Sequence, residues 1–166
     1  LKQLDQEERS ETPEYPAYHY PIHHNCIPHC DVFLDNGYTR EEMKLVNESR
    51  KILGVPDLRL TATAVRVPVI GGHSESVNVT FDKTATCDEI RNLLSASEGV
   101  VVLDVVSKNV YPMPLHAHGK NEVFVGRIRT DESAENTFNL WIVADNLRKG
   151  AATNAVQILQ MLTASR

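Results

Sequence analysis

Arg66 and His73 are the residues of this chain whose types and spacing best suit chemistry on a charged substrate. A guanidinium can hold a carboxylate through two parallel hydrogen bonds, and an imidazole can take up or release a proton near pH 7. Together the two side chains could orient a carboxylate and supply a general acid or base. The alternative is that both are structural or solvated residues of two strands.

Two short strands are expected to position these side chains. Valines alternate with other residues over residues 60–70, which predicts a strand that points Arg66 away from its apolar face. Gly71 and Gly72 follow, where the backbone can reverse or approach a ligand closely. Alternation of apolar and polar residues resumes over residues 74–81 and predicts a second, half-buried strand.

A helix that carries two further charged residues is expected before the first strand. The sequence from Thr39 to Glu42 forms a capping box, and Gly54 is a helix-ending residue. Glu41 and Lys44 are three residues apart, so they share one face of this helix. A glutamate in a first helical turn and a solvated lysine are also common without any function, which leaves both interpretations open.

The rest of the chain predicts a mixed sheet with interspersed helices. Residues 1–19 are charged and then proline-rich, which predicts an extended or partly helical arm before one domain of residues 20–166. Because the later strands and helices do not alternate strictly, we expect an α+β fold. The expected elements are a helix over residues 88–94, strands over residues 100–106, 123–129 and 138–144, and a helix over residues 146–162.

The last expected helix begins next to an amide side chain. Asp145 or Asn146 is a natural N-cap, which explains both residues without a ligand. Gly150 and the two alanines after it would let another backbone approach the start of this helix. His116 and His118 are expected to lie in a loop, and we assign neither a function.

Composition argues against several classes of function. The net charge is −5 and no basic stripe with aromatic residues occurs, so we expect no nucleic-acid partner. No apolar run approaches about 18 residues, so no membrane span is expected. The three cysteines show no disulfide framework and indicate a reducing compartment, the cytoplasm.

A cluster of histidines and cysteines near the N-terminus could form a metal site. Thiolates and imidazoles are good zinc ligands. The cluster lacks a clean C-x-x-C pair, and Pro28 restricts its loop, so we expect no metal there. The alternative function is a non-catalytic dimerisation or binding module, with or without zinc bound through this cluster. Its members are His23, His24, Cys26, His29 and Cys30.

Six long motifs follow one another along the chain: YPI..N.IPH.DVF, GYTREEMKLVNESRKIL, RVPVIGGHSESVNV, YPMPLHAHGKNEVFVGRIR, DESAENTFNLW and NLWIVADNLRKGAATNAVQIL. This series resembles the C-terminal half of aspartate-semialdehyde dehydrogenases over residues 20–162. The family's N-terminal half carries a Gly-rich dinucleotide turn and a nucleophilic cysteine in an Asn-Cys-Ser/Thr context. This sequence contains neither feature and begins with Leu1, so we expect an excised domain or a truncated chain.

The resemblance implies a role for each of five candidate residues. Arg66 would bind the α-carboxylate of the substrate, Glu41 its ammonium group and Lys44 the phosphate. His73 would be the general acid/base, and Asn146 would contact the nicotinamide of NADP. The implied fold is a glyceraldehyde-3-phosphate-dehydrogenase-like C-terminal domain, with helices packed on one face of a mixed sheet.

The implied activity is NADPH-dependent reductive dephosphorylation of L-4-aspartyl phosphate. It gives L-aspartate 4-semialdehyde and phosphate, in the biosynthesis of lysine through diaminopimelate, threonine and methionine. Without the nucleophilic cysteine, the chain alone would be inactive.

The resemblance also implies a homodimer, and residues 74–81 offer a face for it. Small hydroxyl and amide groups pack closely against another surface and still pair their hydrogen bonds. The groups on this polar face are Ser74, Ser76, Asn78 and Thr80.

Overall fold

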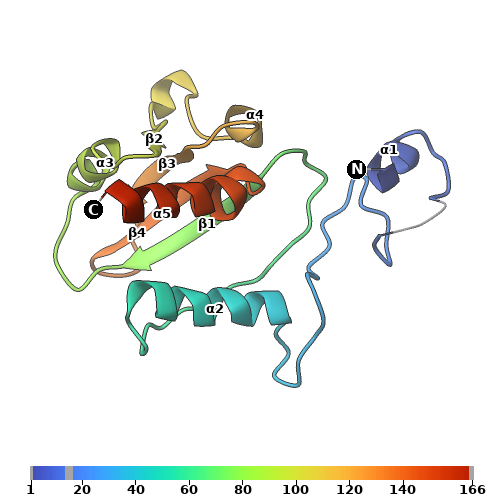
Figure 1. The fold of residues 1–166 in the computed structure, drawn as a ribbon, viewed down its shortest axis with the longest axis horizontal. Helices are drawn as coiled ribbons and strands as arrows, with labels where there is room; N and C mark the ends of the chain where they lie inside the picture. Colours follow the sequence, from blue (N-terminus) through green and yellow to red (C-terminus); the bar gives the residue numbers. More distant parts are fainter. Residues whose placement is uncertain (1, 14–16, 165–166) are drawn as a thin grey trace. The chain divides into compact units, whose positions relative to one another are not determined.

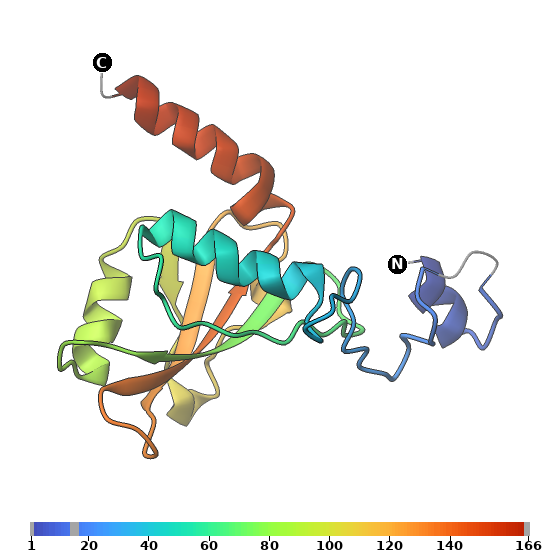
Figure 2. The same ribbon diagram turned by 90° about the horizontal axis from the view of Figure 1, so that it is seen from below.

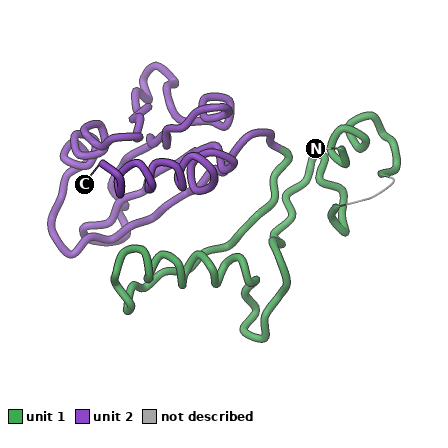
Figure 3. Tube along the Cα trace, viewed as in Figure 1, with its two compact units in different colours: residues 1–68 green, residues 69–166 purple. Residues whose placement is uncertain are grey.

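The computed structural model of the protein describes residues 2–13 and 17–164. The chain forms two compact units, residues 1–68 and residues 69–166, called unit 1 and unit 2 here (Figure 3). The expected division into an arm of residues 1–19 and a domain of residues 20–166 stays a prediction.

Unit 1 begins with a short helix, α1 (Lys2–Glu8), whose polar side chains bind the backbone that follows. The buried Gln3 side chain accepts a hydrogen bond of 2.7 Å from the N–H of Ala17. The Glu7 carboxylate accepts two more, of 2.7 Å from Ile22 and 2.8 Å from His23. The helix and the extended segment are therefore held together by side chain–backbone bonds.

The second helix of unit 1, α2 (Arg40–Leu53), begins and ends where the sequence predicts. The N–H of Glu42 donates to the Thr39 hydroxyl at 3.3 Å, and the Thr39 N–H donates back to the Glu42 carboxylate at 2.7 Å. Gly54 ends the helix in the left-handed conformation, with φ of 67°. Both ends thus satisfy backbone groups that a bare helix would leave unpaired.

The strand expected over residues 60–70 is wrong. Within unit 1 this segment forms a single bridge, between Ile27 and Arg66, and is otherwise irregular. A strand needs a neighbour along its length, and Pro68 has no N–H to donate to one. The alternating valines are correspondingly exposed, at 44% for Val65 and 43% for Val67.

Unit 2 is built on a four-stranded mixed sheet with the strand order β1-β4-β3-β2 (Figure 1). Its strands are β1 (His73–Thr80), β2 (Val100–Val102), β3 (Val123–Thr130) and β4 (Thr137–Ala144). β4 pairs antiparallel with β1 and β3, whereas β2 runs parallel to β3. The α+β fold with a mixed sheet is therefore confirmed.

Helices contact both faces of this sheet within unit 2, and not one face alone as expected. The helix α3 (Cys87–Ser95) buries Ile90 against Val125 and Phe138. The four-residue α4 (Pro114–Ala117) buries Ala117 against Phe124 and Val143, which point to the opposite face because side chains alternate along a strand.

A β-bulge between Gly126 and Arg129 reverses this alternation in β3. Ile128 enters the core beside Ile90, while Arg127 and Arg129 line a hollow on the other face. Without the bulge, two arginines would share the core face of Val125, because a shift of one residue exchanges the faces of a strand.

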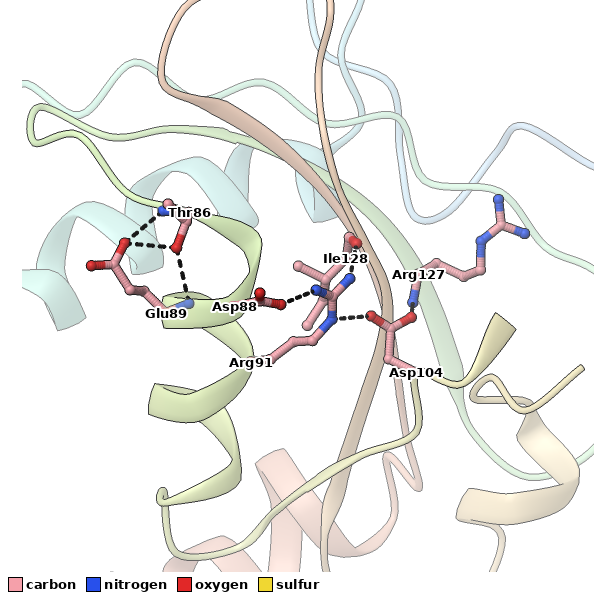
Figure 4. A network of polar contacts seen from close by, with 7 residues as sticks. All are labelled: Thr86, Asp88, Glu89, Arg91, Asp104, Arg127 and Ile128. Carbon is pink, nitrogen blue, oxygen red and sulfur yellow. Dashed lines mark hydrogen bonds and ion pairs between the residues drawn. The ribbon is translucent and has the colours of Figure 1, made fainter. Parts of the chain in front are cut away.

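A buried carboxylate holds the bulge in place (Figure 4). Asp104, whose side chain is 2% exposed, accepts hydrogen bonds from the Arg127 N–H at 2.7 Å and from the Arg91 guanidinium at 2.8 Å. Arg91 also donates to the carbonyl of Ile128 at 2.7 Å. The strand expected over residues 100–106 is shorter in the structure. It ends at Val102, and a 3₁₀ turn follows at Val106–Lys108.

The last helix, α5 (Thr153–Ala164), begins seven residues later than expected. Lys149, Gly150 and Ala151 have non-helical conformations, with Gly150 at φ of 88°, and interrupt an irregular turn over Arg148–Ala152. Figure 2 shows α5 extending away from the sheet of unit 2, and none of its residues is buried. Over residues 2–13 and 17–164, no helix has both the length and the apolar composition needed to cross a membrane.

Candidate active site

Arg66 is held in unit 1 by its backbone. Its N–H donates to the carbonyl of Ile27 at 2.8 Å, and the Ile27 N–H donates back to the carbonyl of Arg66 at 2.9 Å. The exposed guanidinium lies over the ring of Tyr18, 5.9 Å from its centroid. A short bridge therefore fixes the arginine, although no regular strand does.

The buried carboxylate of Glu42 connects this segment to the start of α2. One of its oxygens accepts from the Thr39 N–H, and the other accepts from the Ala64 N–H at 2.8 Å. These two backbone hydrogen bonds lower the pKa of Glu42 below its ordinary value. Glu42 thus joins the helix that carries Glu41 to the segment that carries Arg66.

Glu41 and Lys44 lie side by side on α2, as their spacing predicts. The Lys44 Nζ is 3.7 Å from a carboxylate oxygen of Glu41, and both side chains are about half exposed. Arg66 and Glu41 also act on one buried thiol. Burial raises the pKa of Cys30, the charge of Arg66 lowers it and the charge of Glu41 raises it. The charge of Glu42 raises it as well, so unit 1 places one cation and two anions near Cys30.

Unit 2 brings His73 and Asn146 to the same end of its sheet. His73 is the first residue of β1 and pairs with Ala144, the last residue of β4. Asn146 follows Ala144 by two residues, and the side chains of His73 and Asn146 are both exposed. The sheet register therefore places an imidazole and an amide near one edge.

Gly71 and Gly72 are packed tightly inside unit 2. A side chain on Gly71, where φ is 82°, would collide with Nδ1 of His118. A side chain on Gly72, where φ is 136°, would place its Cβ 2.5 Å from the carbonyl oxygen of Ala144. The close backbone approach that the sequence predicts is thus an approach to unit 2 itself.

Asp145 is a buried carboxylate beside Asn146, and its role differs from the expected helix N-cap. It is 4% exposed and accepts hydrogen bonds from the Gly119 N–H at 2.8 Å and the Leu147 N–H at 3.0 Å. The bond from Gly119 is the main reason that the pKa of Asp145 lies below its ordinary value. Asp145 therefore ties the loop after α4 to the end of β4.

His116 lies in α4 and not in the expected loop, whereas His118 follows the helix. Sequence reasoning missed the contacts of His118. Its Nδ1 lies 3.8 Å from a carboxylate oxygen of Asp145, and its ring covers Gly71. Nothing in the local sequence indicates this, because Gly71, His118 and Asp145 are far apart along the chain.

The histidine and cysteine cluster of unit 1 shows no metal-binding geometry in the described residues. Across residues 2–13 and 17–164, no group of three or more His, Cys, Asp or Glu side chains could hold a metal ion. Cys26 is exposed, whereas Cys30 is buried. The five residues therefore do not converge on a common point.

Comparison with known proteins assigns the chain to a family. Residues 1–149 match the family described as semialdehyde dehydrogenase, dimerisation domain. The chain belongs to this family. It is 54% identical over 145 residues to an aspartate-semialdehyde dehydrogenase of Bacillus subtilis, covering 87% of this chain and 42% of the relative. It is 42% identical over 163 residues to that of Prochlorococcus marinus, covering 98% and 48%.

Solved structures of semialdehyde dehydrogenases share its fold. Aspartate semialdehyde dehydrogenase II of Vibrio cholerae, in a complex described as containing ASA, matches 98% of this chain and 48% of its own. The TM-score is 0.90 and the sequence identity is 40%. The resemblance seen in the motifs is confirmed, and the chain spans about half the length of these relatives.

Proposed function

We propose that the chain is the substrate-binding and dimerisation half of an NADP-dependent aspartate-semialdehyde dehydrogenase. The reaction converts L-4-aspartyl phosphate to L-aspartate 4-semialdehyde and phosphate, in the biosynthesis of lysine, threonine and methionine. The observation that carries the proposal is the arrangement of charges in unit 1, in a chain of this family. Its three cysteines are free thiols, which suits the reducing cytoplasm.

The charges of unit 1 complement those of the proposed substrate. Aspartyl phosphate carries an α-carboxylate, an ammonium group and a phosphate. Arg66 binds the carboxylate through its fork of donors, Glu41 binds the ammonium group, and Lys44 binds the phosphate. The Glu41–Lys44 pair, 3.7 Å apart, places both side chains on one helical face. These interactions orient the substrate.

The groups of unit 2 handle the proton and the nicotinamide. A cysteine thiolate outside this chain attacks the acyl phosphate and expels phosphate, which leaves a thioester. NADPH supplies the hydride that reduces this thioester when it is bound. His73 takes the thiol proton at the start and returns a proton to the departing thiolate at the end. The exposed Asn146 amide fits the carboxamide of the nicotinamide, which offers both a donor and an acceptor.

We also propose a two-fold symmetric homodimer through the polar face of β1. This face continues into a hollow of about 260 Å³ lined by Ser76, Tyr111, Arg127, Arg129, Leu140 and Trp141. Polar side chains around a hollow can be paired by a second copy of the same surface. The dimer is expected to bury at least about 1,200 Å² in total.

A chimeric enzyme tests the catalytic proposal. The N-terminal half of the Bacillus subtilis relative is joined to this chain, and phosphate-dependent reduction of NADP is measured with aspartate semialdehyde. We expect turnover by the chimera and none by the chain alone, because the nucleophile is on the other half. A folded chimera that binds NADP without turnover, or turnover by the purified chain alone, contradicts the proposal.

Ser76→Lys tests the dimer. The chain should sediment as a dimer at tens of micromolar, and the variant as a monomer, because like charges would be buried near the symmetry axis. Glu75→Lys adds a lysine on the opposite face of β1 and should leave the dimer intact. A monomeric wild-type chain or a dimeric Ser76→Lys variant rules this interface out.

A further inference from the structure

We propose that His118 is a positioning residue for His73: its imidazole clamps the Gly71-Gly72 turn against the end of the sheet, beside the buried Asp145. The inference rests on the proposed acid/base role of His73. All of the residues that carry it lie in unit 2.

The first step is the contact between the His118 ring and Gly71. The ring occupies the space that a side chain at position 71 would need, with Nδ1 as the nearest atom. The backbone of His118 is itself anchored, because its N–H donates to the carbonyl of Pro114 at 2.9 Å at the end of α4. The imidazole therefore projects over the turn from an ordered support.

The second step is the anchor behind the ring. Nδ1 of His118 is 3.8 Å from Oδ2 of Asp145, the oxygen that also accepts the Gly119 N–H. At this separation a charged imidazole and the carboxylate attract one another without a direct hydrogen bond. His118 and Arg148 both favour the ionised form of Asp145, since both lower its pKa. The ring is thus held between a fixed carboxylate and the turn.

The third step connects the turn to His73. Gly72 lies against the carbonyl of Ala144, and the next residue, His73, pairs with the same Ala144. The turn is therefore confined by His118 on Gly71 and by β4 on Gly72. Removing the imidazole frees the Gly71 side of the turn, so that the backbone leading into His73 can move. His73 is the first residue of β1. Without the contact between His118 and Gly71, only the residues that follow His73 would hold its backbone in place.

The competing view is that the His118 side chain, which is 63% exposed, has no influence on the turn or on His73. The two views differ in what His73 does when His118 is changed. A side chain without influence leaves the NMR signals of the His73 ring and the environment of the turn unchanged. A clamp alters both, even though the fold of unit 2 is retained.

The experiment follows the imidazole of His73 and the amides of Gly71 and Gly72 by NMR in the isotope-labelled chain. For His118→Ala we expect shifted His73 ring signals, with broadened or doubled glycine amide signals. His118→Asn should restore both, because its amide nitrogen takes the place of Nδ1. His118→Gln, which reaches the position of Nε2 instead, should not restore them.

His116→Ala is the matched control. It removes a bond of 3.2 Å between the Met113 N–H and Nδ1 of His116 in the same helix, without touching the turn. His118→Ala spectra identical to wild type at His73 and both glycines overturn the proposal. If His118→Ala does not fold, equal spectra for the Asn and Gln variants overturn it.

Activity separates this proposal from the proposed function. In the chimera, His118→Ala should lower kcat on the order of tenfold and leave KM nearly unchanged, because it displaces a reacting group rather than a binding group. An inactive chimera counts against the proposed function alone, since the NMR result does not depend on turnover. An active chimera with wild-type kcat in the variant counts against the role of His118.

Discussion

Each unit contains a buried carboxylate that is next in the sequence to a candidate site residue. In unit 1 the buried Glu42 lies beside the half-exposed candidate Glu41, and in unit 2 the buried Asp145 lies beside the exposed candidate Asn146. Each carboxylate accepts two backbone N–H groups, one of them from a segment at least 22 residues away. Both pKa values are lowered for that reason.

The units differ in what else fixes the candidate residues. In unit 1 Arg66 lies in an irregular segment held by one bridge and by Glu42. In unit 2 His73 is held by the register of β1 with β4 and by two packed glycines. The side chain proposed to bind the substrate carboxylate is thus placed by a few backbone bonds. The side chain proposed to move a proton is placed by a sheet.

The largest expected effect compares His73 with Arg66 in the chimera. His73→Ala should lower kcat by about 10²–10⁴-fold, as for loss of a general acid/base. Arg66→Lys should act mainly on kcat/KM for aspartate semialdehyde, because one ammonium group cannot reproduce a bidentate fork. Steady-state kinetics with varied substrate separates the two effects. If Arg66→Lys leaves kcat/KM unchanged, the carboxylate-binding role is wrong.

A second variant asks whether the units are energetically independent. Asp104→Asn removes the charge that binds Arg91 and the bulge of β3, and it should destabilise unit 2 by about 2 kcal/mol. Hydrogen exchange measured on peptides should rise in unit 2 and stay unchanged in unit 1. Asp88→Asn removes the exposed partner of the same arginine and should cost less than about 0.5 kcal/mol. Equal increases in hydrogen exchange in both units would contradict the energetic independence of the two units.

Local signals in the sequence were sufficient for the parts of the fold that are stabilised locally. The capping box of α2 and its glycine end involve residues within four positions of one another, so the sequence predicts them correctly. The strand over residues 74–81 is likewise close to β1, because its alternation matches a half-buried sheet surface. The roles of the five candidate residues rest on the resemblance and stay a proposal.

The remaining features depend on partners that are distant in the sequence. The strand expected over residues 60–70 has no neighbour along its length, and alternation alone cannot supply one. The helix expected from residue 146 begins at Thr153, because Gly150 takes a left-handed conformation and Asp145 binds Gly119. His118 could not be found from the sequence, since its proposed role depends on a contact with Gly71.

The third prediction uses acid to compare the two carboxylates. A carboxyl group with a lowered pKa in the folded state stabilises the fold above its ordinary pKa, and this contribution is lost as pH falls through the lowered value. Stability should therefore fall as the pH drops below the ordinary values of 4.5 for Glu42 and 3.8 for Asp145. Glu42→Gln should weaken this dependence in unit 1 and Asp145→Asn in unit 2, as measured by hydrogen exchange at several pH values. A dependence unchanged in both variants contradicts the assignment.

The smallest expected effect concerns glycines that are needed for different reasons. Gly54 ends α2 at φ of 67°, and no atom lies within 4 Å of the place that an added methyl group would take, so only its conformation is constrained. Gly54→Ala should therefore cost about 1 kcal/mol, and Gly54→Asn less, because asparagine tolerates the left-handed region. Gly71→Ala adds a collision with His118 to the same conformational cost, so it should lower the denaturation midpoint further. Chemical denaturation of the three variants measures the difference. Equal losses for Gly54→Ala and Gly71→Ala would mean that the His118 ring moves aside freely, which would also remove the steric basis of its proposed clamp.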